Sequence, residues 1–203
     1  RSGFSVGRDE KLLGLHGSPT SELIFDNVRV PVENRLGEEG EGFRVAMVTL
    51  DEARLNCAAM ALGVASAALD LAVDYAKQRE QFGKPIIEHQ GLQFLLAEVT
   101  TEVAAARALW EKAIAIIERE KSREASVWAA LAKLASTDAA MRATTEAVQV
   151  FGAAGLSRAQ PVERLMRDVK AFQIFDGTNQ IQKMLIGRHL QRYGSPLSGT
   201  VDI

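Results

Sequence analysis

Cysteine, aromatic residues and blocks of like charge are all scarce in this 203-residue chain. Its single cysteine, Cys57, cannot form an internal disulfide, which favours a reducing, cytoplasmic setting. The 24 Lys and Arg residues against 26 Asp and Glu give a net charge of −2, spread without a basic block. Because a nucleic-acid-binding protein needs a basic face to contact phosphates, the composition argues against that class.

Long apolar runs are missing too, and so is an initiator methionine. The longest uncharged run covers residues 55–69, which is shorter than the about 20 strongly apolar residues that a transmembrane helix needs. The first residues show no signal-peptide or transit-peptide pattern. We therefore expect no membrane partner, and we expect Arg1 to be a cut end. No Cys/His cluster has the spacing of metal ligands, so no metal is predicted.

The chain does have a large apolar share, 47%, and an uneven distribution of glycine and proline. Seven of the 16 glycines and two of the five prolines lie in the first 42 residues, whereas residues 86–151 contain one glycine and no proline. The first part is therefore predicted to form strands and turns, and the rest long helices. Residues 22–30 are β-branched and aromatic and predict a strand, and residues 3–7 predict a shorter one.

Apolar residues recur at three- and four-residue steps over several long stretches. They predict helices over about 42–79, 90–118, 127–151, 161–169 and 178–191. Four long helices joined by short loops favour a mainly α fold, an antiparallel up-down four-helix bundle. Small residues over 58–68 would let helices approach closely, which suits contact with a second copy.

Two helix ends carry residues that could bind an anion, and each has a plain structural alternative. Asp176 lies just before Gly177 and Thr178 at the mouth of the last predicted helix, where free backbone N–H groups can take an anion. Alternatively, Asp176 or Thr178 is only an N-cap. Residues 149–155 (Gln-Val-Phe-Gly-Ala-Ala-Gly) could approach a phosphate, or could be a helix C-cap.

Three further pairs or segments are open to the same two interpretations. Arg79–Gly83 places a guanidinium and an aromatic ring at a helix end, which suits a pyrophosphate and a flat ring, although such an Arg also complements the helix dipole. His89 and Gln90 open the next helix, where a lone His is commonly structural. Asp51 and Arg54 lie one turn apart, as in an ordinary i, i+3 ion pair.

Taken in order, these segments resemble the C-terminal region of the acyl-CoA dehydrogenase family. Residues 20–31 resemble the last strand of its middle domain, and Arg79–Pro85 resembles its Arg-x-x-Phe-Gly motif. Gln149–Gly152 resembles Gln-x-x-Gly-Gly. Phe175–Gln182 (Phe-Asp-Gly-Thr-Asn-Gln-Ile-Gln) resembles Tyr-Glu-Gly-Thr-x-x-Ile-Gln.

The resemblance implies how the chain divides and what it does. Residues 1–38 would be the last strands of the middle β domain, and residues 39–203 the C-terminal helical bundle domain. Family members are homodimeric or homotetrameric flavoproteins of fatty acid metabolism. They use FAD to oxidise an acyl-CoA to the 2-enoyl-CoA, and an electron-transfer flavoprotein usually takes the electrons. Most contacts to the flavin ring would lie upstream, so the chain alone is expected to be inactive.

The resemblance also assigns roles residue by residue. Asp51 and Arg54 would line the thioester end of the substrate pocket, together with Asp176, which would be the catalytic base. Three groups of residues would contact FAD, the first two of them in a site shared with a neighbouring subunit: Arg79, Phe82, His89 and Gln90; Gln149, Val150, Phe151, Gly152 and Ala153; and Gly177, Thr178 and Gln180.

Two residues depart from the family pattern. The usual base is Glu, and Asp176 is one methylene shorter, a loss of about 1 Å in reach that can cost about a hundredfold in rate. Ala153 stands where a second Gly is common. Some relatives place the base just before the Arg of Asp-x-x-Arg, but that position here is Ala53, so Asp176 is the better candidate.

The shorter carboxylate keeps two other functions open. One is a nitroalkane-oxidase-like flavoenzyme, in which an Asp base deprotonates a different carbon acid. The other is a non-catalytic helical assembly subunit. Reaction with nitroethane would indicate the first, and a protein that stays colourless after reconstitution with FAD would indicate the second.

Overall fold

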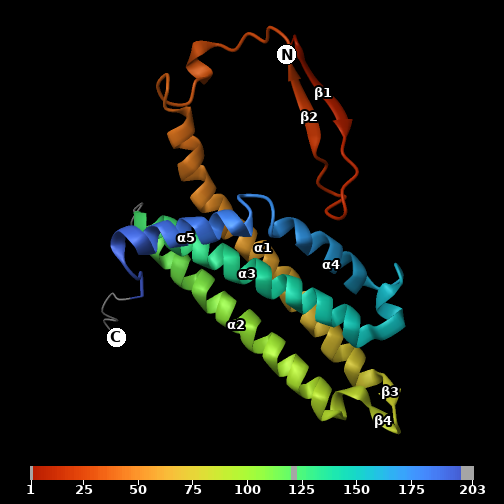
Figure 1. The fold of residues 1–203 in the computed structure, drawn as a ribbon. Helices are drawn as coiled ribbons and strands as arrows, with labels where there is room; N and C mark the ends of the chain where they lie inside the picture. Colours follow the sequence, from red (N-terminus) through yellow and green to blue (C-terminus); the bar gives the residue numbers. More distant parts are fainter. Residues whose placement is uncertain (1, 120–122, 198–203) are drawn as a thin grey trace.

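The computed structural model describes residues 2–119 and 123–197 and is mainly helical, as predicted (Figure 1). Three long helices run side by side: α1 (Gly42–Gln78), α2 (Gln90–Arg119) and α3 (Arg123–Phe151). Two shorter helices follow, α4 (Pro161–Phe172) and α5 (Asn179–Tyr193). Because α3 contacts the other four helices, it is the central element of the bundle.

The helices α1 and α3 pack closely because alanines line their contact. Along α1 the buried alanines recur at three- and four-residue steps, and they share two core clusters with alanines of α3. Alanine loses no side-chain entropy on burial and lets two backbones approach. The buried alanines of α1 are Ala58, Ala61, Ala65, Ala68, Ala72 and Ala76. The small-residue face expected to contact a second copy is therefore used inside the chain.

By length and composition alone, α1 is the one helix in the described part of the chain that could cross a membrane. Core helices of soluble proteins pass the same test. In this structure, 39% of the most apolar stretch of α1 is already buried within the protein.

The connections between helices are short and locally determined. After α1, a small hairpin pairs β3 (Glu80–Gln81) with β4 (Lys84–Pro85), and η2 (Ile86–Glu88) leads into α2. The turn of this hairpin has positive φ angles at Phe82 (54°) and Gly83 (78°). A 3-10 turn, η3 (Gly152–Leu156), follows α3 at the glycines that were predicted to end it.

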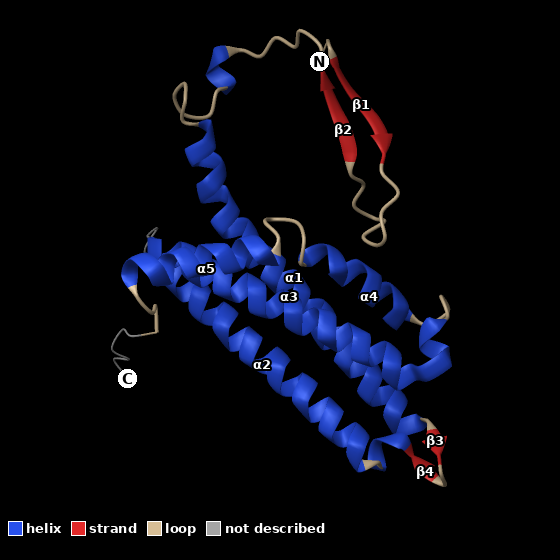
Figure 2. Cartoon of the chain, in the orientation of Figure 1, coloured by secondary structure: helices blue, strands red, loops and turns tan. Residues whose placement is uncertain are grey.

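A two-stranded antiparallel hairpin precedes the bundle and stands apart from it (Figure 2). It pairs β1 (Phe4–Asp9) with β2 (Ser21–Phe25), and Phe4 lies opposite Phe25. The predicted strand over 22–30 is too long, because β1 offers no partner beyond Phe25. The apolar side chains of the hairpin remain 41–66% exposed (Phe4, Val6, Leu23, Ile24, Phe25), since two strands alone cannot enclose a core.

The loop between these strands is anchored to α4. The Leu15 amide donates to Asp168 Oδ1 at 2.6 Å, and Arg167 Nη1 donates to the Leu13 carbonyl at 3.0 Å. Between them Gly14 is buried, and a Cβ placed on it would lie 2.5 Å from the Arg167 carbonyl oxygen. This contact therefore requires a glycine at position 14.

Replacing Gly14 with Ala is expected to release this loop from α4. Relieving the clash requires a backbone shift that costs about 1–3 kcal/mol. This corresponds to roughly 5- to 150-fold faster hydrogen exchange at the Leu15 amide, which mass spectrometry or NMR measures. Gly17→Ala is the matched control, because nothing lies within 4 Å of a Cβ there. Equal exchange in both variants would contradict the anchoring.

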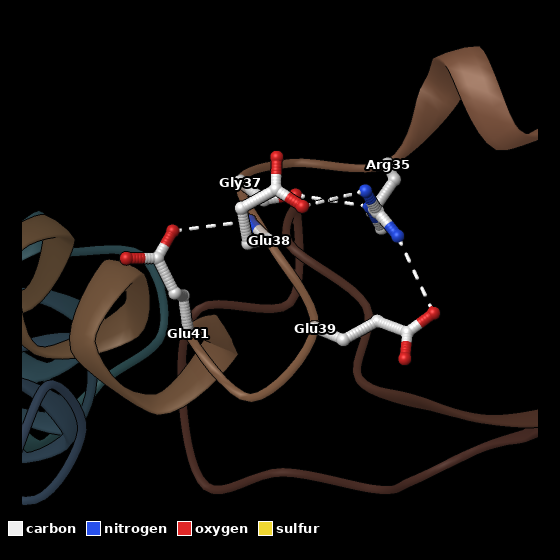
Figure 3. Close-up of polar contacts among 5 residues, drawn as sticks. All are labelled: Arg35, Gly37, Glu38, Glu39 and Glu41. Carbon is white, nitrogen blue, oxygen red and sulfur yellow. Dashed lines mark hydrogen bonds and ion pairs between the residues drawn. The ribbon is translucent and has the colours of Figure 1, made fainter.

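The segment that enters α1 is organised by Arg35 (Figure 3). Following η1 (Val32–Asn34), its guanidinium donates to the Gly37 carbonyl and pairs with Glu38 and Glu39. The Glu38 amide donates to Glu41 Oε2 at 3.0 Å and holds the pKa of Glu41 below its ordinary value. These contacts are exposed, so they direct the chain into α1 and add little to stability.

Candidate functional site

Three of the predicted site residues come together where α1 meets the turn between α4 and α5. Arg54 and Asp51 lie on α1, and Arg54 Nη1 donates to Asp51 Oδ1 at 2.5 Å. Asp176 lies in the turn and interacts electrostatically with Arg54. The structure thus joins the residues that the resemblance places in a substrate pocket.

Arg54 is more deeply buried than the arginine of a surface ion pair. Only 6% of the residue is exposed, and its Nε has no hydrogen-bond partner among the described residues. Asp51 also accepts a hydrogen bond from Ser126 Oγ of α3 at 2.9 Å, which holds the pair in place. Because an unmet buried donor is destabilising, Arg54 leaves a donor that a polar ligand atom could satisfy.

Asp176 has the environment of a general base. It is half-buried, and burial raises the pKa of its carboxyl above the ordinary 3.8, while Lys133 and then Arg54 act to lower it. The positive φ of Asp176 (54°) and of Gly177 (88°) turns the chain sharply before α5. A carboxyl that is partly removed from water and interacts electrostatically with two cations is suited to proton transfer.

Thr178 resolves one of the alternatives posed by the sequence. Its Oγ1 accepts a hydrogen bond from the Ile181 amide at 3.3 Å, so Thr178, rather than Asp176, is the N-cap of α5. Gly177 is half-buried beside it, and Gln180 is exposed on the first turn of α5.

Lys133 is the residue of this site that sequence reasoning missed. It is fully buried, and its Nζ donates to the Gly177 carbonyl and to Asn179 Oδ1, each at 2.9 Å. A signal was present, because Lys133 is the one charged residue between Glu124 and Asp138 in an alanine-rich helix. A lone Lys in such a helix has to reach solvent or a partner.

A second group of predicted residues gathers at the far end of the bundle. Arg79, at the end of α1, and Val150–Ala154, at the end of α3, line an open pocket of about 340 Å³. The Tyr75 ring stacks on Phe151 with centroids 4.1 Å apart. Gly152 has a φ of 58°, so the backbone changes direction where α3 ends. Four of the five residues predicted from this segment thus line one pocket with Arg79.

The remaining residues predicted at this end lie beside the pocket. Phe82 is 93% exposed, and its ring meets His89 edge-on with centroids 5.9 Å apart. His89 Nε2 also forms a hydrogen bond with the Gln81 carbonyl at 3.2 Å, which is the structural role posed as its alternative. Gln90 and Gln149 are exposed on α2 and α3.

The two groups are far apart within one chain. Arg54 lies on α1 and Arg79 follows the last residue of that helix, 25 residues further on, which corresponds to roughly 37 Å. One small ligand cannot contact both ends. As for metals, the described ranges 2–119 and 123–197 hold no group of three or more His, Cys, Asp and Glu that could bind an ion.

The half-buried Asp176 carboxyl and the buried Arg54–Asp51 pair together form a candidate ligand site in a helical bundle. Residues 40–191 match the sequence profile described as acyl-CoA dehydrogenase, C-terminal domain. The chain therefore belongs to the acyl-CoA dehydrogenase family, whose members are flavoprotein oxidoreductases.

Relatives and solved structures agree with this assignment. The chain is 50% identical over 190 residues to the short-chain specific acyl-CoA dehydrogenase of Megasphaera elsdenii, covering 94% of this chain and 49% of that one. The structure of butyryl-CoA dehydrogenase from the same organism superimposes with a TM-score of 0.91 at 50% identity, with the same coverage. A structure of PigA with FAD and proline gives 0.88 at 27% identity, covering 94% and 49%. The chain thus spans about half the length of the relatives that it matches.

Proposed function

We propose that this chain forms part of a cytoplasmic, FAD-dependent acyl-CoA dehydrogenase that converts an acyl-CoA thioester to its 2-enoyl-CoA. The observation that carries the proposal is the half-buried Asp176 carboxyl, which lies in a sharp turn and interacts electrostatically with the buried Arg54. The names of the relatives, which include dehydrogenases of short acyl-CoA substrates, support the substrate class.

In this proposal Asp176 removes the α-proton of the acyl group. As the proton leaves, negative charge develops on the thioester oxygen and needs a donor. The Asp176 amide N–H makes no backbone hydrogen bond in the described structure, so it is free to donate to that oxygen. Arg54 and Asp51 position the thioester end of the substrate. Bound FAD supplies the acceptor for the β-hydride, at N5 of its ring.

The far end of the bundle fits a flavin dinucleotide. Arg79 offers a guanidinium for a pyrophosphate, and the exposed ring of Phe82 offers a flat surface for stacking. Gly177, Thr178 and Gln180 would contact FAD near Asp176. The two ends of the bundle are roughly 37 Å apart, so one FAD could contact residues of both ends only if these ends came from two neighbouring copies of the chain. We therefore propose a homodimer or homotetramer.

Replacing Phe82 with Ala is expected to weaken FAD retention without destabilising the fold. The side chain is 93% exposed, so unfolding free energy should stay within about 0.5 kcal/mol of the original. Loss of one stacking face is expected to raise the Kd for FAD about 5- to 10-fold. Fluorescence titration of the apoprotein with FAD measures this. Phe94→Ala, another exposed Phe at 60%, is the control. If both variants bind FAD like the original, Phe82 has no role in binding.

The function is tested on protein expressed from the full reading frame and loaded with FAD. Anaerobic titration with acyl-CoAs of different length and branching should bleach the flavin absorbance, and the product should be a 2-enoyl-CoA. Bleaching by nitroethane alone would indicate a nitroalkane-oxidase-like enzyme instead. A protein that stays colourless after reconstitution would indicate an assembly subunit. In an assay that supplies an electron-transfer flavoprotein, we expect turnover.

A further inference from the structure

The buried Lys133 of α3 directly contacts the turn that carries Asp176. Its side chain has no exposed surface, so its ammonium group is held entirely by protein atoms. Lys133 Nζ donates to two acceptors that follow Asp176 in the chain, the Gly177 carbonyl and Asn179 Oδ1, each at 2.9 Å. Burying an amine in a helical core is costly unless such partners are in place, and burial indeed lowers the pKa of Lys133.

The Gly177 carbonyl is held from two sides. Besides Lys133, Gln182 Nε2 of α5 donates to it at 2.8 Å, and Gln182 is itself fully buried. Since the Asp176–Gly177 peptide precedes this carbonyl directly, fixing its direction also restricts the backbone of Asp176. A bulkier residue at 177 would be strained by the φ of 88°, and its Cβ would lie 2.8 Å from Gln182 Nε2, which would have to move.

The other acceptor of Lys133 belongs to a closed hydrogen-bond network. Asn179 Nδ2 donates to Thr137 Oγ1 at 2.9 Å and to Asp138 Oδ1 at 2.7 Å, both on α3. Gln173 Nε2 also donates to Asp138 Oδ1, at 2.6 Å, from the start of the same turn. The turn is therefore tied to α3 before, at and after Asp176.

We propose that Lys133 is a positioning residue for Asp176: it fixes the turn through the Gly177 carbonyl and supplies a positive charge near the carboxylate. The inference rests on the proposed function, because it assigns Lys133 to the base of that reaction. Because Lys133 is fully buried, it would not touch the substrate. It acts through the backbone and through its charge.

The charges around Asp176 determine how its pKa responds to the loss of Lys133. From α3 it faces Lys133, which is itself close to Asp138; from α1 it faces Arg54, which Asp51 pairs, and Cys57. Burial raises the pKa of Cys57 to about 12, so the thiol is neutral near pH 7. Removing the Lys133 charge takes away the main influence that lowers the pKa of Asp176, so that pKa should rise.

The test uses Lys133→Met, which keeps the shape without the charge, and Lys133→Gln, which keeps a donor, in the FAD-loaded full-length protein. We expect flavin reduction by butyryl-CoA at the pH plateau to slow about 10- to 100-fold, as for a base displaced by up to 1 Å. The acid limb of the rate should move up by about 1 pH unit or more. The amides of residues 176–179 should exchange faster with solvent.

Two controls separate positioning from stability. Thr137→Val removes a hydroxyl of the same network but leaves both bonds of Lys133, so it should lower Tm without moving the acid limb. Lys183→Met removes an exposed lysine of α5 and should change neither rate nor limb.

The outcomes also distinguish this inference from the function on which it rests. If Asp176→Asn abolishes flavin reduction while both Lys133 variants keep the original rate, acid limb and amide exchange, Lys133 has no positioning role. If Asp176→Asn reduces the flavin normally, Asp176 is not the base and the inference about Lys133 fails with it. If the original protein does not reduce its flavin with any acyl-CoA, the proposed function itself fails. If neither Lys133 variant folds and binds FAD, Lys133 is a core residue, and the proposal is rejected.

Discussion

The Asp176→Asn variant is expected to reduce its flavin about 10²- to 10⁴-fold more slowly than the original protein when mixed with an acyl-CoA. Asn has nearly the same shape as Asp but cannot accept the α-proton, so substrate should still bind while the chemical step fails. Stopped-flow measurement of flavin bleaching separates the two. A loss confined to kcat, with the Kd for acyl-CoA within about twofold, is the expected pattern.

The same carboxyl is expected to set the pH dependence of the rate in the original protein. Burial raises the pKa of Asp176 above 3.8, so the carboxylate is lost, and with it the rate, as the pH falls through that raised pKa. The free energy of unfolding depends on pH in the opposite direction to the rate, because the native state favours the protonated form of Asp176. That contribution is present at low pH and is lost as the pH rises above 3.8 through the folded pKa. Asp176→Asn should therefore be at least as stable as the original near pH 7.

Asp70→Asn is the matched control, because Asp70 is an exposed carboxylate on α1. It should leave the rate, the pH profile and Tm unchanged. A full loss of rate in Asp176→Asn together with a fall in Tm would point to misfolding rather than to a missing base. A normal rate in Asp176→Asn would place the base elsewhere.

Replacing Trp128 with Ala is expected to have the largest effect on stability, a loss of about 3–5 kcal/mol. The side chain is 2% exposed and packs in a core cluster with Leu55 and Ala113. Lys112 Nζ lies 4.2 Å from the ring centroid, so a cation–π contact would be lost as well. Guanidinium unfolding followed by circular dichroism gives the free energy directly.

Trp128→Phe provides the comparison, since it keeps an aromatic ring and leaves a smaller cavity. We expect it to lose clearly less than the Ala variant. Leu55 is the neighbour of Arg54, so the cavity in the Ala variant also removes support next to the candidate site. A loss below about 1 kcal/mol for Trp128→Ala would mean that the core collapses to fill the space.

Much of the fold could be predicted because glycine and proline mark its helix ends. The helix predicted over 42–79 is found at Gly42–Gln78, and the one over 90–118 at Gln90–Arg119. The start of α3 was placed four residues late, because its first turn is charged and lacks the apolar step that was counted. The strand predicted over 22–30 stops at Phe25, since strand length depends on a partner that periodicity does not reveal.

The site was predictable only where its residues form a local motif. Asp176, Arg54 and Asp51 could be named as candidates because short patterns surround them. Lys133 was not, because its partner Gly177 lies 44 residues away and no local spacing connects them. The contact between Leu15 and Asp168 spans 153 residues and was missed for the same reason. Such contacts arise from the way α3 and α4 pack, which a single sequence does not state.

The left-handed backbone at Asp176 gives the shorter side chain a second meaning. Most L-residues are disfavoured in this region by roughly 1–2 kcal/mol, whereas Asp and Asn visit it readily. A Glu at this position would extend farther toward the α-carbon but would sit less easily at a φ of 54°. Glu and Asp at this position therefore differ in two respects: Glu reaches farther, whereas Asp is less strained by the positive φ. If Asp176 is the base, its side chain reaches less far than that of Glu, but its backbone adopts a φ of 54° without the penalty that a Glu would meet.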